Sequence, residues 1–181
     1  MKTKHITLFL FAMLGGLSIS SCLNDDFLLD WDKAKETTII ELPYRTHTLV
    51  ASNQLTTSNY TFNLLVNCCA VFASDIKQDI PVGIAVDQNL VNKYNTENGL
   101  DGTTAARQPY ILMPAAAYAF PATVTIKTGI RESEFSVPVN TSMLTPGVKY
   151  LIPLVISSAP APYVISGNFG MLYLRVDMRA L

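Results

Sequence analysis

The histidines are the first residues to consider for catalysis, because a Ser-His-acid triad needs one. The 181-residue sequence contains His5 and His47. His5 lies in an apolar leader described below, so a triad would have to use His47, and no Gly-x-Ser-x-Gly motif accompanies it. We interpret His47 as a strand-edge residue that points toward solvent. A small hydrolase that uses His47 is the alternative.

Pairs of carboxylates are the second candidate, because a glycosidase needs two acids at a fixed separation, one of them with a raised pKa. Glu132 and Glu134 alternate to the same face of a predicted strand, and Asp75 and Asp79 flank a predicted turn. Acids in such places are usually solvated, and the sequence indicates no cleft around them. The sequence therefore predicts no catalytic residues, and we expect a protein that is not an enzyme.

Cysteine and histidine together could bind a metal, since zinc takes three or four convergent ligands. Once Cys22 is assigned to another role below, His47, Cys68 and Cys69 are left. Adjacent cysteines on a strand point to opposite faces, so they do not easily share a metal ion. We expect one of them to pack in the core and the other to face away, with a strained vicinal disulfide as the alternative. No metal and no cofactor are predicted.

Tyrosines are the residues best suited to contact a sugar, because a pyranose ring stacks on a flat aromatic face and the phenol adds a hydrogen bond. Five tyrosines fall in predicted loops or rims. They are Tyr44, Tyr60, Tyr94, Tyr118 and Tyr163. Each is a candidate glycan-binding residue, and packing in the core or at its rim is the alternative for each.

The first 21 residues predict a secretory signal peptide. Lys2 and Lys4 precede an apolar run over 6–19, which is shorter than the ~20 residues of a transmembrane helix. The run ends in the sequence Leu-Ser-Ile-Ser-Ser-Cys, which resembles a bacterial lipobox. Cys22 is therefore the predicted lipidation site, carrying palmitate or a related acyl chain. An ordinary secretory signal with an incidental cysteine is the alternative.

Acidic residues follow this cysteine almost at once. Asn24, Asp25 and Asp26 resemble the surface-export signal of Bacteroides-type lipoproteins, and a solvated linker is the alternative. We expect residues 22–36 to form a lipidated tether. We also expect a chain anchored in the outer membrane through Cys22 and facing the cell exterior. A periplasmic orientation is left open, because Asp after the lipidated cysteine can signal inner-membrane retention in other hosts.

The charge balance excludes one class of partner. The signal peptide holds two of the 13 basic residues and no acids, which leaves 11 basic against 14 acidic residues and a net charge of -3. Proteins that hold nucleic acid neutralise phosphates with an excess of Lys and Arg. We therefore expect no nucleic-acid partner.

Short strands separated by Pro and Gly are predicted after the tether. The predicted strands are 37–42, 60–73, 80–87, 123–127, 134–139, 150–156 and 172–178, and 110–114 is predicted as a short strand or turn. Pro81 favours an edge strand or a bulge, and a short helix over 89–94 follows Asp87, which can cap it. The pattern predicts an all-β fold. We expect an immunoglobulin-like antiparallel β-sandwich of about seven or eight strands with one short helix, over residues 37–181.

The order of these segments resembles a known family. The segments are Ile80 to Asp87, Leu90-Val91 with Tyr94-Asn95, Tyr110 to Pro114, Val124 to Ile126 with Gly129, and Tyr150 to Ile156. This order resembles the Bacteroides-type surface-lipoprotein domain of unknown function 1735, an N-terminal domain found ahead of family-18 glycosidase, discoidin-like or lectin-like modules. The resemblance implies an immunoglobulin-like sandwich and a place in cell-surface glycan capture, and it implies no catalytic residues.

Together these features predict a non-catalytic cell-surface lipoprotein module, either a spacer or an interaction domain, in a glycan capture and uptake system. Its expected partners are the membrane, through the anchor at Cys22, and polysaccharide or outer-membrane glycan-uptake proteins. Two alternatives stay open. One is a lectin-like protein that binds glycan directly, and the other is a fimbrial or adhesin subunit that assembles by strand addition.

Overall fold

The computed structural model describes residues 38–44, 46–51 and 59–178. The predicted signal peptide, the tether over 22–36 with Cys22 and the export signal, and the predicted loop over 52–58 lie outside these residues. Within the described ranges, no helix has both the length and the apolar character needed to cross a bilayer.

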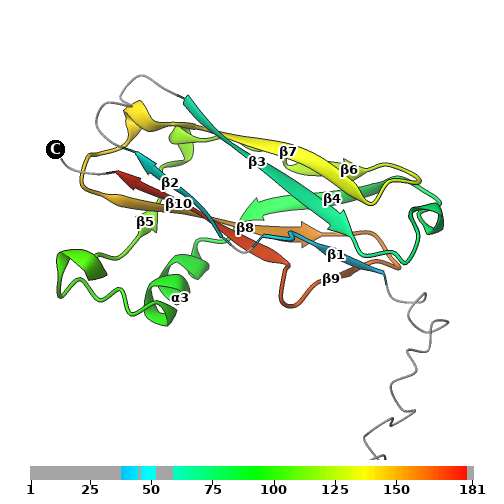
Figure 1. Cartoon of the computed structure of the whole chain (residues 1–181), viewed down its shortest axis with the longest axis horizontal. Helices are drawn as coiled ribbons and strands as arrows, with labels where there is room; N and C mark the ends of the chain where they lie inside the picture. The colour runs from blue at the N-terminus through cyan, green and yellow to red at the C-terminus, as the bar shows by residue number, and fades with distance from the viewer. Residues whose placement is uncertain (1–37, 45, 52–58, 179–181) are drawn as a thin grey trace, which may run out of the picture. The chain divides into compact units, whose positions relative to one another are not determined.

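Two β-sheets pack face to face, which confirms the predicted β-sandwich (Figure 1). One sheet has the strand order β7-β3-β1-β9, and the other has the order β2-β10-β8-β4-β6 with β5 paired to β8. The described strands are β1 (Ile39–Glu41), β2 (Thr46–Ala51), β3 (Asn59–Cys68), β4 (Ile80–Val86), β5 (Ile111–Leu112), β6 (Thr123–Ile126), β7 (Glu132–Asn140), β8 (Lys149–Ser158), β9 (Val164–Ile165) and β10 (Met171–Met178).

Alternating side chains fill the space between the sheets, as the sequence pattern predicts. In β3 every second residue from Phe62 to Cys68 is buried, and in β7 the same holds from Phe135 to Val139. These two strands form the longest ladder of the first sheet, with Leu64 opposite Phe135. Because the side chains of a strand point alternately to its two faces, the polar residues between them face outward.

The helix α3 (Asn89–Glu97) lies on the outer face of the second sheet, on the side away from β3 and β7 (Figure 1). Val91 and Tyr94 are buried there against Leu151 of β8 and Tyr110. This layer explains why β8 is apolar on both faces, since one face meets the main core and the other meets the helix. As predicted, Asp87 stands at the start of the helix, where its carboxylate accepts the backbone N–H of Asn89 at 3.0 Å.

Two strands escaped prediction, and both add parallel pairs to the antiparallel sandwich. β2 runs parallel to β10, and β9 runs parallel to β1. β5, which was predicted as a strand or turn, is also parallel to its partner β8.

The chain crosses from the first sheet to the second between β1 and β2, where Pro43 stands and has no N–H to donate to a ladder. β2 carries the polar sequence THTLVA, so local alternation could not identify it.

Pro81 lies in β4, an interior strand between β6 and β8, rather than at a sheet edge. It pairs with Thr125 of β6, but the ladder with β8 begins only at Gly83, so the proline needs no partner on that side. The register shifts between Gly83 and Ile84. The bulge, rather than the edge position, is therefore the predicted feature that the structure confirms.

Candidate functional site

Two of the five candidate tyrosines gather around His47. The centroid of Tyr44 lies 5.2 Å from the imidazole of His47, His47 lies 6.4 Å from Phe62, and Phe62 lies 4.9 Å from Tyr60. All three contacts are edge-on, which is the favoured geometry for aromatic pairs. Tyr44 is 50% exposed and Tyr60 is 39% exposed. We call Tyr44, His47, Tyr60 and Phe62 the aromatic patch.

His47 does not point toward solvent, and this corrects the interpretation from the sequence. It lies in β2 opposite Leu174 of β10, which is fully buried, so both side chains face the first sheet. The ring is half-buried, and its Nε2 atom is buried with no hydrogen-bond partner. Burial lowers the pKa of His47 below the ordinary value of 6.5. His47 is therefore neutral, and its ring packs against the ring of Tyr44.

The other three candidate tyrosines lie apart from this patch. Tyr94 of α3 is buried against the second sheet, where its ring contacts Tyr110 and Tyr173. Tyr118 is half-buried and stacks on Phe120 at 6.1 Å. Tyr163 is half-buried against the main core. No observation tests glycan binding by any of the five, so each assignment stays a prediction.

The cysteines divide as predicted. Cys68 and Cys69 are both free thiols, the first buried in the core and the second exposed. The pKa of Cys69 is raised to about 11, first by burial and then by the side chain of Glu41. The thiol is therefore protonated at neutral pH and a weak nucleophile. Within the described ranges, no three His, Cys, Asp or Glu side chains converge as metal ligands would.

The candidate carboxylates act locally rather than in pairs. Asp79 accepts hydrogen bonds from Lys127 Nζ at 2.7 Å and from the backbone of Thr128 at 2.9 Å, and these bonds lower its pKa to about 2. Asp75 accepts the backbone N–H of Phe72 at 3.2 Å. Glu132 and Glu134 are exposed on the outer face of β7, as their positions in the strand predict.

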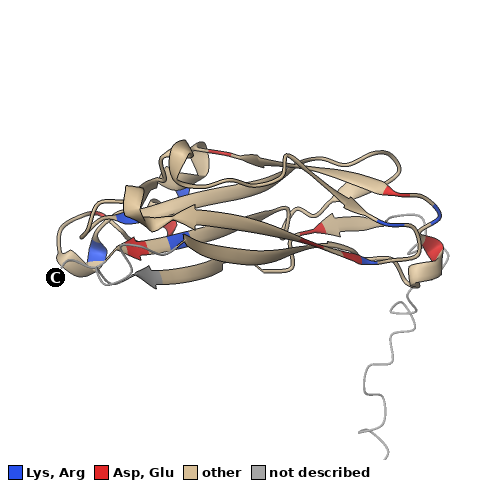
Figure 2. Cartoon of the chain, turned by 90° about the horizontal axis from the view of Figure 1, so that it is seen from above, with Lys and Arg blue, Asp and Glu red and all other residues tan. Residues whose placement is uncertain are grey.

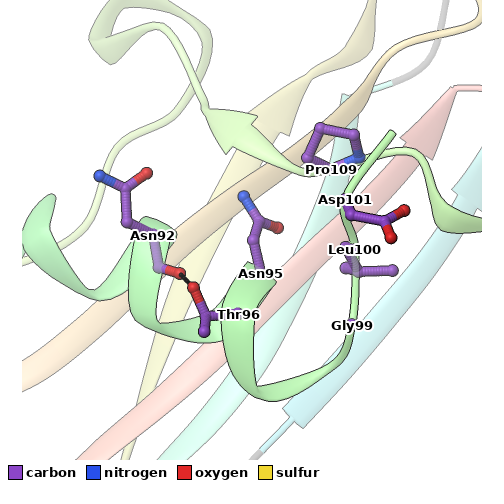
Figure 3. Close-up of a pocket in the computed structure, with 7 residues that line it drawn as sticks. All are labelled: Asn92, Asn95, Thr96, Gly99, Leu100, Asp101 and Pro109. Atoms are coloured by element: carbon purple, nitrogen blue, oxygen red, sulfur yellow. Dashed lines mark hydrogen bonds between the residues drawn. The ribbon is translucent and has the colours of Figure 1, made fainter. Parts of the chain in front are cut away.

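A groove that the sequence did not reveal lies beside α3 (Figure 3). Its volume is about 510 Å³, within the range of small-molecule sites. The lining residues are Asn92, Asn95, Thr96, Gly99, Leu100, Asp101 and Pro109. In Figure 3, Asn92 and Asn95 project from the same side of the helix, and Pro109 lies on a neighbouring segment. The lining combines amides, one hydroxyl and one carboxylate with two apolar side chains.

A second groove of about 460 Å³ lies beside the N-terminal part of the same helix, next to the first groove. Its lining residues are Gln88, Asn89, Val91, Asn92, Tyr110, Ile111 and Leu112. Asn92 lines both grooves. The amide-rich sequence of the helix, with Gln88, Asn89, Asn92 and Asn95, was the signal that could have pointed to this surface.

A family model described as "-like, N-terminal domain" matches residues 34–162. The match covers most of the chain, and the chain therefore belongs to this family of N-terminal domains. No curated protein matches the sequence.

Solved structures with the same fold come from Bacteroides. A Bacteroides ovatus protein proposed to bind carbohydrate matches with a TM-score of 0.61 and 14% identity, over 78% of this chain and 37% of its own. A two-domain protein of unknown function from Bacteroides fragilis matches with a TM-score of 0.60 and 14% identity, over 86% of this chain and 50% of its own. At these identities the likeness shows the fold.

A third match supports the resemblance drawn from the sequence. It is a Bacteroides ovatus multidomain protein that includes DUF1735, with a TM-score of 0.56 and 20% identity, over 77% of this chain and 44% of its own. The predicted resemblance to the domain of unknown function 1735 is confirmed. This chain spans half or less of the length of these three proteins.

Proposed function

We propose that this chain is a non-catalytic, lipid-anchored module of the cell surface that supports glycan capture and uptake. It acts as a spacer or interaction domain that holds a binding surface away from the membrane. The chain belongs to a family of N-terminal domains, and this supports a role as a spacer or interaction domain. The proposed carbohydrate binding of one protein with the same fold supports the link to glycans.

The observation that carries the glycan contact is the aromatic patch. Tyr44 and Tyr60 expose their rings while Phe62 and His47 hold those rings from below. A sugar ring that stacks on a tyrosine buries the apolar C–H face of the sugar, and the phenol hydroxyl remains able to hydrogen-bond. Because His47 stays neutral at physiological pH, the patch presents no fixed charge of its own to a neutral polysaccharide.

The proposed anchor is an acyl group at Cys22, with Asn24, Asp25 and Asp26 directing the chain to the outward face of the outer membrane. A single acyl chain binds a bilayer only marginally, and two or more chains make attachment effectively permanent. The tether over 22–36 then separates the sandwich from the bilayer.

Radioactive palmitate incorporation in cells tests the anchor. The unaltered chain should carry the label, and Cys22→Ser should lose it. Cys69→Ser is a matched control, because Cys69 is also an exposed free thiol, and this variant should keep the label. Protease treatment of intact cells should then degrade the labelled chain. An unlabelled chain, or equal labelling of the Cys22→Ser variant, would show that the anchor is wrong.

Affinity electrophoresis in gels that contain neutral polysaccharides tests the glycan contact. We expect at least one polysaccharide to retard the mature chain, and the double substitution Tyr44→Ala with Tyr60→Ala to weaken the retardation. Phe72→Ala is the control, because Phe72 is an exposed aromatic residue outside the patch. Retardation that the double substitution leaves unchanged would exclude the patch as a contact.

A further inference from the structure

We infer that the two grooves beside α3 form a second binding site, one that takes a neutral oligosaccharide. This inference rests on the proposed role in glycan capture, but it concerns a different surface. The two surfaces lie on opposite faces of the second sheet. His47 of β2 faces the first sheet as part of the aromatic patch, whereas the next residue, Thr48, faces outward and binds Arg175, which in turn binds Tyr94 of α3.

The dimensions of the surface suit a chain of sugar units. Each groove, at about 510 Å³ and about 460 Å³, falls within the range of small-molecule sites. Asn92 borders both grooves, so a ligand that ran along this face of the helix from one groove to the other would pass this amide. Its side chain has no hydrogen-bond partner among the described residues. Its backbone carbonyl accepts a hydrogen bond from Thr96 Oγ1 at 2.9 Å. The amide donor and acceptor of Asn92 are thus both available to a ligand.

The floor of the site is rigid before any ligand arrives. Asn95 donates from Nδ2 to the carbonyl of Tyr110 at 2.8 Å and accepts the N–H of Tyr110 at 2.9 Å. This pair of bonds ties the helix to the segment that forms the far wall of the grooves. At the end of the helix, Asn98 donates to the carbonyl of Tyr94 at 2.8 Å. A site on a fixed helix loses little conformational entropy when it binds.

The chemistry of the lining favours neutral polyhydroxylated ligands over anionic ones. Amide side chains both donate and accept hydrogen bonds, as sugar hydroxyls do. Leu100, Ile111 and Leu112 supply apolar walls for the C–H faces of a sugar. The single charged residue of the two linings is Asp101, an acid, whose pKa is lowered by its hydrogen bonds to Thr103. Figure 2 shows basic and acidic residues interspersed along the chain. Near the grooves, Arg107 pairs with Asp101 at 3.4 Å, and Lys149 and Arg175 lie over the ring of Tyr110 at 5.7 and 5.9 Å.

Nuclear magnetic resonance of the mature, ¹⁵N-labelled chain in micelles of a sugar-free detergent tests this site. The probes are maltoheptaose, cellohexaose and mannohexaose as neutral oligosaccharides, with trigalacturonate as the anionic comparison. We expect at least one neutral probe to shift the side-chain amide signals of Asn92. The signals of Asn63, an exposed amide on β3 of the other sheet, should stay in place. Trigalacturonate should leave the Asn92 signals unchanged.

Two matched variants complete the experiment. Asn92→Leu should weaken binding of the active neutral probe at least about fivefold, the effect of losing about one hydrogen bond, while the neighbouring Lys93→Leu should leave affinity within about twofold. The inference is wrong if no neutral probe moves the Asn92 signals, if Asn92→Leu binds as tightly as the unaltered chain, or if trigalacturonate binds there equally well.

The outcomes separate this inference from the proposed function. If Tyr44→Ala with Tyr60→Ala weakens glycan retention while Asn92 never responds, the α3 site is wrong and the proposed function stands. If Asn92 responds but palmitate labelling of Cys22 fails, the α3 site stands and the anchored role is wrong.

Discussion

At the scale of single residues, neighbouring side chains of β2 serve opposite faces of one sheet. His47 packs inward between Tyr44 and Phe62, and Thr48 faces outward. There the hydroxyl of Thr48 accepts hydrogen bonds from the guanidinium of Arg175 at 2.9 and 2.6 Å. A one-residue shift in the register of this strand would exchange the two side chains, so these contacts fix the register.

The half-buried imidazole of His47 makes stability depend on pH. Because burial lowers its pKa below 6.5, the unfolded chain binds more protons than the folded chain just below that pH. The free energy of unfolding should therefore decrease as the pH falls through 6.5, and it should level off below the folded-state pKa of His47. Urea unfolding of the mature chain at about pH 7.5 and about pH 5.5 measures this difference.

His47→Phe is the control for this pH dependence, because the variant keeps an aromatic ring in the patch and removes the titrating group. Its unfolding free energy should change less between the two pH values than that of the unaltered chain. An equal dependence in both proteins would show that another group is responsible.

At the scale of elements, the packing of α3 on the second sheet depends on the two hydrogen bonds between Asn95 and Tyr110. Asn95→Ala removes both bonds and leaves the N–H and C=O of Tyr110 in a partly buried site without these partners. We expect the free energy of unfolding to fall by about 1–3 kcal/mol, as measured by urea denaturation.

The matched control for this change is Asn92→Ala, because Asn92 is one turn earlier on the same helix and its side chain is exposed. This variant should alter stability by no more than about 0.5 kcal/mol. If the two variants were equally stable, the hydrogen bonds between Asn95 and Tyr110 would contribute nothing to the free energy of unfolding.

The connection between β9 and β10 offers a second test at this scale. A Cβ atom on Gly170 would overlap the backbone carbonyl oxygen of Ser166 and would lie 3.0 Å from Ile165 Cγ2. Gly170→Ala should therefore destabilise the chain by about 1–3 kcal/mol, because backbone must move to relieve the overlap. Thermal unfolding checks this effect.

Gly167→Ala provides the comparison within the same connection. Nothing lies within 4 Å of a Cβ atom built on Gly167, so this variant should lie within about 0.5 kcal/mol of the unaltered chain. Equal unfolding temperatures for the two alanine variants would contradict the steric explanation.

At the scale of the whole sandwich, both sheets contribute to one main core. Leu64 of the first sheet and Leu174 of the second are almost completely buried and belong to the same cluster of apolar side chains. A single core shared by two sheets should unfold in one cooperative transition.

Leu64→Ala and Leu174→Ala should each lower the free energy of unfolding by about 2–5 kcal/mol, because each leaves a cavity in the shared core. The transition should remain single in both variants, by circular dichroism and by tyrosine fluorescence. Leu112→Ala is the control, since Leu112 is 36% exposed, and it should have a much smaller effect. Separate transitions for the two sheets would refute the shared core.

Local patterns were sufficient to predict the elements whose burial repeats along the chain. Period-two alternation identified β3, β7 and β10, and the apolar run with Pro81 identified β4 and its bulge. The opposite environments of Cys68 and Cys69 followed from the same geometry. β2 was missed, because its partner β10 lies more than 120 residues away and local polarity does not record that pairing.

The sequence alone determined the alternation that buries one face of each long strand, because neighbouring side chains of a strand must point to opposite sides whatever the strand packs against. It also determined the amides of α3 and the tyrosines available for contact. Only the tertiary structure decided which of these residues meet. It turned His47 inward, buried Tyr94, linked Tyr44 to Tyr60 through His47 and Phe62, and placed Asn92 between two grooves. These outcomes depend on contacts between distant segments, whose free energies no local stretch of sequence contains.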